Sequence, residues 1–309
     1  MLVALGTPLK GRPRPWEHFK VPALMVNAYE IIGNEKLRRD IQAKGLHDFL
    51  NYNGLIFVDS GGFQAMKHRI DIDVDKLIDI YKIAEADYYF SLDYPSPSAR
   101  NSKIRILRTI ENFEKLRRAI EHVIPVVHPN IKRALIEYDA YKKHHPKYIA
   151  IGGLVPLMLT TRGLLNGRKM AIDLITEIRK RHKRNLHVMG LGAPTVIQIL
   201  KVLKCNSTDS AAWRIKAAHG KIMIPNKGER YISNKKANFG VVPLCEDDKR
   251  NIEKTRCPLL KEYDWDYLEK SFEARALLNA WVTLYCAEES EQLNGPFATL
   301  LEYAKQFKL

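Results

Sequence analysis

The chain has 309 residues, 46% of them apolar, and its 50 Lys and Arg outnumber its 35 Asp and Glu, which gives a formal charge of +15 at pH 7. This apolar content excludes an intrinsically disordered chain, and 17 Gly with 15 Pro exclude a collagen-like or low-complexity one. The length fits either two domains or one α/β barrel of about 250 residues with an appendage. Because each neutralised phosphate releases counterions, the excess positive charge favours nucleic acid over a membrane surface as the partner.

Two further features of the sequence concern its compartment. No stretch approaches the roughly 18 uninterrupted apolar residues of a membrane-spanning helix, and the N-terminal apolar run is too short for a signal peptide. We therefore expect a cytoplasmic protein with no membrane partner. Its four cysteines, Cys205, Cys245, Cys257 and Cys286, are expected to be reduced thiols rather than a disulfide framework.

Short apolar runs alternate with segments of helical periodicity, which predicts a parallel β-sheet. The runs cover residues 3–5, 23–28, 55–59, 88–93, 124–128, 148–154, 186–191 and 203–209. The predicted helices cover residues 35–50, 74–85, 102–122, 132–144, 169–184 and 195–203. This alternation fits an α/β fold with an eight-stranded parallel β/α (TIM) barrel better than an open doubly wound sheet.

The pattern changes after residue 210. Residues 219–233 predict a β-hairpin with its turn at Lys227-Gly228, residues 240–262 indicate a loop-rich connector, and residues 265–307 regain helical periodicity. We therefore divide the chain into a barrel domain with its hairpin, residues 1–235, and a helical extension packed on the barrel, residues 236–309.

Polar residues at the ends of predicted strands are the candidates for chemistry, because barrel enzymes react at the carboxyl ends of their strands. The sequence VDSGGFQ at residues 58–64 combines Asp59 with two glycines, which allow close backbone approach, and with Phe63, which can stack on a flat ligand. Asp93 and Asp209 end two other predicted strands. Each acid also fits a turn or a helix N-cap. Three carboxylates at one mouth of a chain of charge +15 favour acid–base or nucleophilic chemistry.

The DSGGFQ stretch resembles the tRNA-guanine transglycosylase family, whose members exchange a guanine in nucleic acid for a 7-deazaguanine. The resemblance continues in order over roughly residues 20 to 235. Residues 24–29 resemble the family's LGNTYHL stretch, 92–95 its pocket Asp segment, 151–154 its GGLAVGE segment and 188–194 its LMGVGTP segment. Thr208-Asp209-Ser210 is similar to the family's nucleophile segment FDC, and residues 220–222 to the hairpin that follows it.

The resemblance implies a role for each carboxylate. Asp209 would attack C1′ of the target nucleotide and form a covalent glycosyl-enzyme, and Asp59 would be the general acid and base. Asp93 would bind the edge of the base, and Phe63 would stack on its face. The implied substrate-binding set also includes Ser60, Gly61, Gly62, Gln64, His128, Gly152, Gly153, Leu154, Met189 and Gly190. His128-Pro129-Asn130 stands where the family has Gln-Gly-Gly, so the resemblance leaves the preference between incoming bases open.

The family also carries a zinc ion bound by a CxCxxC set and a later His, and this chain lacks the pattern. Cys257-Pro258-Leu259-Leu260 has no following Cys, and Leu278-Asn279 stands where His-Asn is expected. We therefore expect no cofactor and no complete zinc site. Buried apolar thiols are the expected role of these cysteines.

The nucleic acid itself is expected to be DNA, with tRNA as the alternative. The short chain and the DYP sequence at residues 93–95 resemble the 7-deazaguanine DNA transglycosylase branch, which inserts bases such as preQ0. Arg214, Lys216 and Lys221 are the candidate phosphate contacts. Homodimer formation and a need for accessory proteins to open a duplex stay open. A non-catalytic nucleic-acid-binding subunit is a competing interpretation, and a small-anion lyase is disfavoured because no Lys ends a predicted strand.

Overall fold

The centre of the molecule is a barrel of parallel strands. The computed structural model describes residues 1–95, 102–159, 165–232, 242–289, 293 and 296–309. The strands of the barrel are β1 (Leu2–Gly6), β2 (Ala23–Asn27), β3 (Leu55–Asp59), β4 (Tyr88–Phe90), β5 (Val123–Ile124), β6 (Val126–Val127), β7 (Tyr148–Ile151), β8 (Asn185–Val188) and β9 (Ser207–Ser210). They form one sheet in the order β5-β4-β3-β2-β1-β9-β8-β7-β6.

The barrel closes through a strand that Pro125 interrupts. β5 pairs with β4 and β6 pairs with β7, so the two halves of this strand bond to opposite neighbours. Proline has no N–H to donate at this point, although its carbonyl accepts a bond from the Ala150 N–H at 2.9 Å. With β5 and β6 taken as the strand predicted at residues 124–128, every predicted strand is present. The predicted parallel β/α barrel is confirmed.

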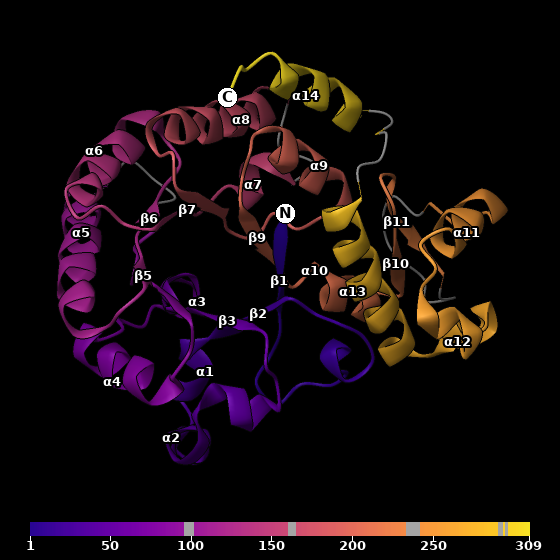
Figure 1. The fold of residues 1–309 in the computed structure, drawn as a ribbon, viewed down its shortest axis with the longest axis horizontal. Helices are drawn as coiled ribbons and strands as arrows, with labels where there is room; N and C mark the ends of the chain where they lie inside the picture. The colour runs from indigo at the N-terminus through magenta and orange to yellow at the C-terminus, as the bar shows by residue number, and fades with distance from the viewer. Residues whose placement is uncertain (96–101, 160–164, 233–241, 290–292, 294–295) are drawn as a thin grey trace.

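Helices surround the strands on the outside of the barrel (Figure 1). Buried apolar residues on the inner faces of the outer helices, such as Leu77, Ile80 and Ile175, pack against the sheet. The helices of the barrel are α1 (Ala28–Ile32), α2 (Glu35–Leu50), α3 (Gly62–His68), α4 (Val74–Ala84), α5 (Ser102–Ala119), α6 (Ile131–Lys142), α7 (Val155–Met158), α8 (Leu165–Arg181), α9 (Pro194–Val202) and α10 (Ala212–Ala218). None of the described helices is both long and apolar enough to span a membrane.

The last strand of the barrel differs from its prediction. We expected residues 203–209, but the strand is Ser207–Ser210, and Leu203 is instead the C-cap of α9. The Cys205 N–H still bonds back to the carbonyl of Leu200 at the end of that helix. The apolar run therefore combines a helix end with a strand start, which periodicity does not separate.

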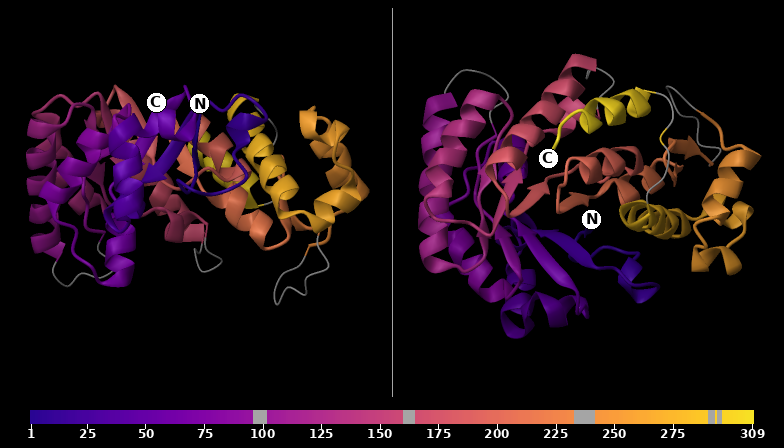
Figure 2. Two further views of the ribbon diagram at one scale, coloured as in Figure 1. Left: turned by 90° about the horizontal axis from the view of Figure 1, so that it is seen from below. Right: turned by 45° about the horizontal axis from the view of Figure 1, so that its top comes forward.

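The C-terminal part of the chain stands beside the barrel (Figure 2). The predicted hairpin is present as β10 (Lys221–Ile224) and β11 (Gly228–Tyr231), and α13 (Phe272–Glu288) packs against β10 and α10. Asn279 of α13 accepts a bond from the Met223 N–H at 2.7 Å and donates to the carbonyl of Trp213 at 3.0 Å. Two further helices of this part are α12 (Trp265–Lys270) and α14 (Pro296–Lys305). The predicted boundary at residue 235 lies outside the described residues.

The predicted connector at residues 240–262 contains a helix, α11 (Glu246–Glu253), so a purely loop-rich segment was the wrong prediction. An ion pair holds this helix to the hairpin. The carboxylate of Asp248, which is 1% exposed, lies 3.2 Å from Lys227 Nζ and 2.9 Å from Arg230 Nε. The hairpin and α11 are therefore joined by buried charge as well as by apolar contact.

Asp248→Ala is expected to lower the free energy of unfolding by about 3 kcal/mol, because it leaves two cations without their buried partner. Urea unfolding followed by circular dichroism measures this. Asp247→Ala is the matched control, since Asp247 is exposed on the same helix and pairs with exposed Arg250; its expected change is below about 0.5 kcal/mol. Equal effects of the two substitutions would contradict a structural role for the pair.

Candidate active site

Three carboxylates and two histidines meet at the carboxyl end of the barrel. Asp59 is the last residue of β3, Asp93 follows β4, and Asp209 lies in β9. His128 follows β6, and His187 lies in β8. Because parallel strands end at the same edge of a barrel, residues far apart in the sequence are gathered at one mouth. The structure therefore brings together the three acids that the sequence singled out.

Asp59 is held by two hydrogen-bond donors, but burial and two nearby acids make it resist ionisation. Asn27, which pairs with it in the β2–β3 register, donates from Nδ2 to Oδ2 at 2.7 Å, and the Gly61 N–H donates to the same oxygen at 3.3 Å. Burial, followed by the charges of Asp93 and Asp209, raises the pKa of Asp59 to about 7. A carboxyl group of this pKa can both give and take a proton near neutral pH.

Asp209 is fixed through one of its two carboxylate oxygens. The Gly190 N–H donates to Oδ1 at 2.8 Å, and Nε2 of His187 lies 3.2 Å from the same atom. Gly190 has φ +73, a backbone conformation that a residue with a side chain rarely adopts. No described residue bonds Oδ2, so this oxygen is free to act on a ligand.

His187 was not among the candidates from the sequence, because it lies inside an apolar strand. It pairs in register with Ser207, whose hydroxyl lies 2.9 Å from Nδ1. Side chains alternate along a strand, so Ser207 and Asp209 point to the same face of β9. Ser207 and Asp209, two residues apart on one face of β9, are the feature of the sequence that could have predicted a polar partner in the neighbouring strand.

Asp93 belongs to a buried charged network. Nε2 of His128 lies 2.7 Å from Asp93 Oδ2, and Nδ1 lies 3.0 Å from Glu137 Oε1. Arg133 donates from Nε to Glu137 Oε1 at 2.7 Å and from Nη2 to the carbonyl of Tyr94 at 3.1 Å. Burial lowers the pKa of His128, but the carboxylates of Glu137 and Asp93 outweigh it and raise that pKa to about 9.

Glu137 and Arg133 were also not among the sequence candidates. They lie four residues apart on α6, so they share a helix face, and both are buried. A pair of opposite charges at that spacing usually indicates a solvated helix face. The residue that reveals their role, Asp93, lies on another element.

The DSGG turn is explained by the closeness of its glycines to other parts of the site. A Cβ on Gly62 would lie 2.5 Å from the backbone carbonyl of Asp93. Ser60 and Gly61 are buried, whereas Phe63 is 60% exposed at the mouth. Glycine at position 62 therefore lets β3 and the segment after β4 approach each other, and the exposed ring that follows can contact a ligand.

The remaining predicted pocket residues follow β7 and β8. Gly152 and Gly153 come after β7, with Leu154 buried behind them, and Met189 and Gly190 come after β8. The amides of Gly152 and Gly190 are already engaged with Val127 O and Asp209 Oδ1. These loops can wall a flat ligand, but these two amides do not donate to it.

Three buried side-chain oxygens near the mouth lack a hydrogen-bond partner among the described residues. They are Thr7 Oγ1 after β1, Gln64 Oε1 in α3 and Ser91 Oγ after β4. Buried polar atoms are usually paired, so oxygens without a partner mark places where a ligand or water can bond. All three lie at the carboxyl end of the barrel.

The predicted phosphate contacts are largely engaged within the protein. Lys216 and Lys221 both pair with Glu229, at 2.6 and 2.5 Å. Arg214 bonds the backbone carbonyl of Arg12 and lies over the ring of Phe272. The single carboxylate of Glu229 is shared by both lysines, and phosphate would have to compete with it for either one.

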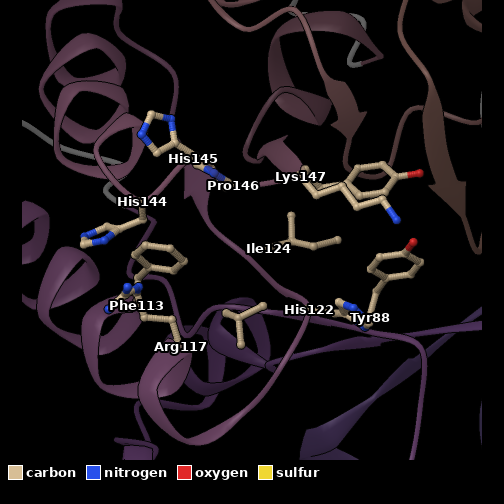
Figure 3. Close-up of a pocket in the computed structure, with 11 residues that line it drawn as sticks. Tyr88, Phe113, Arg117, His122, Ile124, His144, His145, Pro146 and Lys147 are labelled. Carbon is tan, nitrogen blue, oxygen red and sulfur yellow. The ribbon is translucent and has the colours of Figure 1, made fainter.

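A separate pocket lies at the opposite end of the barrel (Figure 3). Tyr88, Val123 and Tyr148, the first residues of β4, β5 and β7, line it together with His144 and Lys147 from the segment before β7. Its lining contains no Asp or Glu. The carboxylate site and this pocket are therefore distinct.

Comparison with known proteins identifies the family of the chain. The family model described as queuine tRNA-ribosyltransferase matches residues 3–284. The tRNA-guanine(15) transglycosylases of Methanosarcina mazei and Methanosarcina acetivorans are 26% and 28% identical to the chain, over 86% of it and 52% of each relative. Uncharacterized protein 306 of Sulfolobus islandicus rod-shaped virus 1 is 29% identical, over 74% of the chain and 70% of that protein.

The chain thus spans about half the length of the tRNA-guanine(15) transglycosylases just named. The matched range includes the strands of the barrel except for Leu2, the first residue of β1, together with the three carboxylates at its mouth and the hairpin. The family that the sequence motifs indicated is confirmed: this chain belongs to the queuine tRNA-ribosyltransferase family.

Proposed function

We propose that this chain exchanges guanine in a nucleic acid for a 7-deazaguanine such as preQ0, through a covalent intermediate on Asp209. The observation that carries the proposal is the set of Asp59, Asp93 and Asp209 at one barrel mouth, each in a different environment. Asp209 is anchored by the Gly190 N–H and His187, Asp59 has a pKa near 7, and Asp93 is bonded to His128, which also contacts Glu137. Different environments give carboxylates in one site different chemical roles, which is typical of enzymes that use several of them.

In the proposed reaction, Asp209 Oδ2 attacks C1′ of the target nucleotide. The bond from C1′ to the glycosidic nitrogen breaks, its electron pair stays with guanine, and protonated Asp59 gives the departing base a proton. The ionised Asp59 then takes a proton from the incoming base, whose nitrogen attacks C1′ and displaces Asp209. Two inversions at C1′ give net retention, as in retaining glycosidases.

The proposed pocket holds the base between the β3, β7 and β8 loops. Asp93 binds its edge, Phe63 stacks on its face, and Gly153, Met189 and Gly190 wall it. Support comes from the exposure of the Phe63 ring and from the unpaired oxygen of Gln64, which can accept a bond from a base. The target nucleotide has to be flipped out of any helix to reach this mouth.

We favour DNA as the nucleic acid and keep tRNA as the alternative. The LDYP sequence at residues 92–95 supports DNA, whereas the names of the Methanosarcina relatives refer to tRNA. The charge of +15 supports either polyanion. Release of labelled base separates the two.

The test uses purified protein with DNA and, separately, tRNA that carry radiolabelled guanine, in the presence of a 7-deazaguanine base. We expect the label to be released from DNA. Release from tRNA alone would assign the chain to tRNA modification. Release from neither would contradict the proposal and favour a non-catalytic subunit. Asp139→Asn, on the exposed face of α6, is a control that should release label at the wild-type rate.

The zinc ion that the resemblance implies does not fit the residues of this chain. Cys245 is exposed at the start of α11, whereas Cys257 and Leu278 are buried in the same apolar cluster. Burial raises the pKa of the Cys257 thiol to about 11, which suits an apolar thiol. Within the described ranges, no three His, Cys, Asp or Glu side chains are grouped to hold a metal ion. We propose that the Asp248 ion pairs, rather than a metal, fix the hairpin to α11.

A further inference from the structure

The His128 side chain lies behind Asp93 rather than at the surface of the mouth. It is 1% exposed, and both of its ring nitrogens are engaged. The His128 N–H of the backbone also donates to Glu137 Oε2, at 2.8 Å. A residue this enclosed acts on a ligand through its neighbours, which differs from the direct base contact that the family resemblance implies.

The arrangement of charges defines the protonation of this ring. Both nitrogens of His128 face a carboxylate oxygen, from Asp93 on one side and Glu137 on the other. Two carboxylates, one guanidinium from Arg133 and one imidazolium make the buried cluster neutral, whereas a neutral ring leaves it with a net negative charge. Arg133 Nη2, which carries two N–H groups, donates to the carbonyl of Tyr94 and lies 3.0 Å from Nδ1, so a neutral ring with Nδ1 as an acceptor is the competing arrangement.

We propose that Glu137 and Arg133 are positioning residues that hold His128 as an imidazolium, whose Nε2–H donates to Asp93 and keeps that carboxylate an acceptor for the N–H edge of the bound base. The role of the base rests on the proposed function, whereas the protonation of His128 does not. Asp93 shares the mouth with Asp59 and Asp209, and three negative charges together favour protonating one of them. The imidazolium places a compensating positive charge beside Asp93, while burial and the other two acids raise the pKa of Asp59.

The other groups that face this network are consistent with an imidazolium. From α6, Tyr141 is buried beside Glu137, and burial raises the pKa of its hydroxyl far above the ordinary value, so it stays neutral. Asp209 lies across the mouth and adds negative charge there, and Asp59 does so above its pKa of about 7. Arg133 is the cation of α6 in the network, and it is bonded to Glu137. The cation opposes a proton on His128, whereas the acids favour it. The protonation of the His128 ring shows which effect is the stronger.

The direct test is nitrogen-15 NMR of the full chain with labelled histidine, in which His128→Gln assigns the signal. We expect both ring nitrogens of His128 to have imidazolium shifts at pH 7.5 and to titrate near pH 9. In Glu137→Gln the ring is expected to be neutral at pH 7.5, whereas Glu111→Gln, at an exposed position of α5, leaves it charged. A neutral ring in the wild-type protein, with Nδ1 accepting from Arg133, would overturn the proposal, and this measurement on the wild-type protein needs His128→Gln only to assign the signal.

The kinetic test follows the incoming base. Glu137→Gln is expected to raise KM for the 7-deazaguanine roughly tenfold with a smaller change in kcat, because it weakens a charge-assisted bond to a binding group. Arg133→Lys, which keeps the cation, should restore more of the affinity than Arg133→Met. If Arg133→Lys and Arg133→Met instead change kcat and KM to the same extent, and the NMR signal of His128 is unchanged, the role of Arg133 is merely structural. If the wild-type chain exchanges no base at all, the proposed function fails while the NMR result still decides the state of His128.

Discussion

Asp209→Asn is expected to abolish both the covalent adduct and base exchange, with a rate at least roughly 10³-fold below that of the wild-type protein. The amide has almost the same shape as the carboxylate and can still accept the bond from the Gly190 N–H on its oxygen. It loses the negative charge and the nucleophilic Oδ2. The loss therefore reports chemistry rather than the shape of the site. Denaturing electrophoresis of protein mixed with labelled nucleic acid measures the adduct.

A matched control separates the nucleophile from general loss of charge. Asp173→Asn removes a carboxylate from α8 that accepts a bond from the Tyr303 hydroxyl, away from the mouth. This variant should form the adduct at the wild-type rate and unfold at a similar temperature. Adduct formation by Asp209→Asn at the wild-type level would remove Asp209 from the mechanism. It would point instead to one of the other two carboxylates as the attacking group.

The positions of the three acids could be predicted because strand ends are visible in the sequence. Asp59 ends and Asp93 follows a short apolar run, Asp209 lies near the end of the polar strand β9, and in a closed parallel barrel all such positions meet. Asp59 is the clearest case, since the close approach of Gly62 to Asp93 explains the motif that marked it. The order of strands and helices in the sequence was therefore enough to predict that the three acids lie together. Their separate environments required the structure.

The partners of these acids could not be predicted from local patterns. Gly190 and His187 contact Asp209 across 19 and 22 residues, and His128 contacts Asp93 across 35. Their own neighbourhoods fit ordinary roles as strand interior or turn. Hydrogen bonds over such separations depend on strand register, which the sequence alone leaves undefined.

The helix α11 was missed for a different reason. Its sequence, EDDKRNIE, contains one apolar residue, Ile252, so it has no apolar stripe to detect. Its buried face is completed by Asp248, which pairs with Lys227 and Arg230 of the hairpin. A helix that buries a charged side chain in this way has no apolar stripe, so apolar periodicity does not predict it.

The two half-reactions are expected to respond to pH in opposite directions, with a break near pH 7 set by Asp59. Burial and the charges of Asp93 and Asp209 raise the pKa of Asp59 to about 7, from an ordinary value near 4. Below the break the group is protonated and can give a proton to departing guanine. Above it the group is ionised, so the rate of adduct formation should fall about tenfold per pH unit, while transfer to the incoming base, which needs the ionised group, should rise up to the break and level off above it. Rapid-quench measurement of each half-reaction from pH 5 to 9 tests this.

Two variants assign the break to Asp59. Asp59→Asn should remove it, and Asp93→Asn should move it to lower pH, because one of the charges that raise the pKa is lost. A break that persists in Asp59→Asn would assign the titration to another group.

Thermal unfolding tests the raised pKa of Asp59 independently of the reaction. The folded chain keeps a proton on Asp59 that the unfolded chain releases near pH 4, so this group makes folding less favourable as pH rises from about 4 to 7. Asp59→Asn should therefore be more stable than the wild-type protein at pH 8, with a much smaller difference at pH 5.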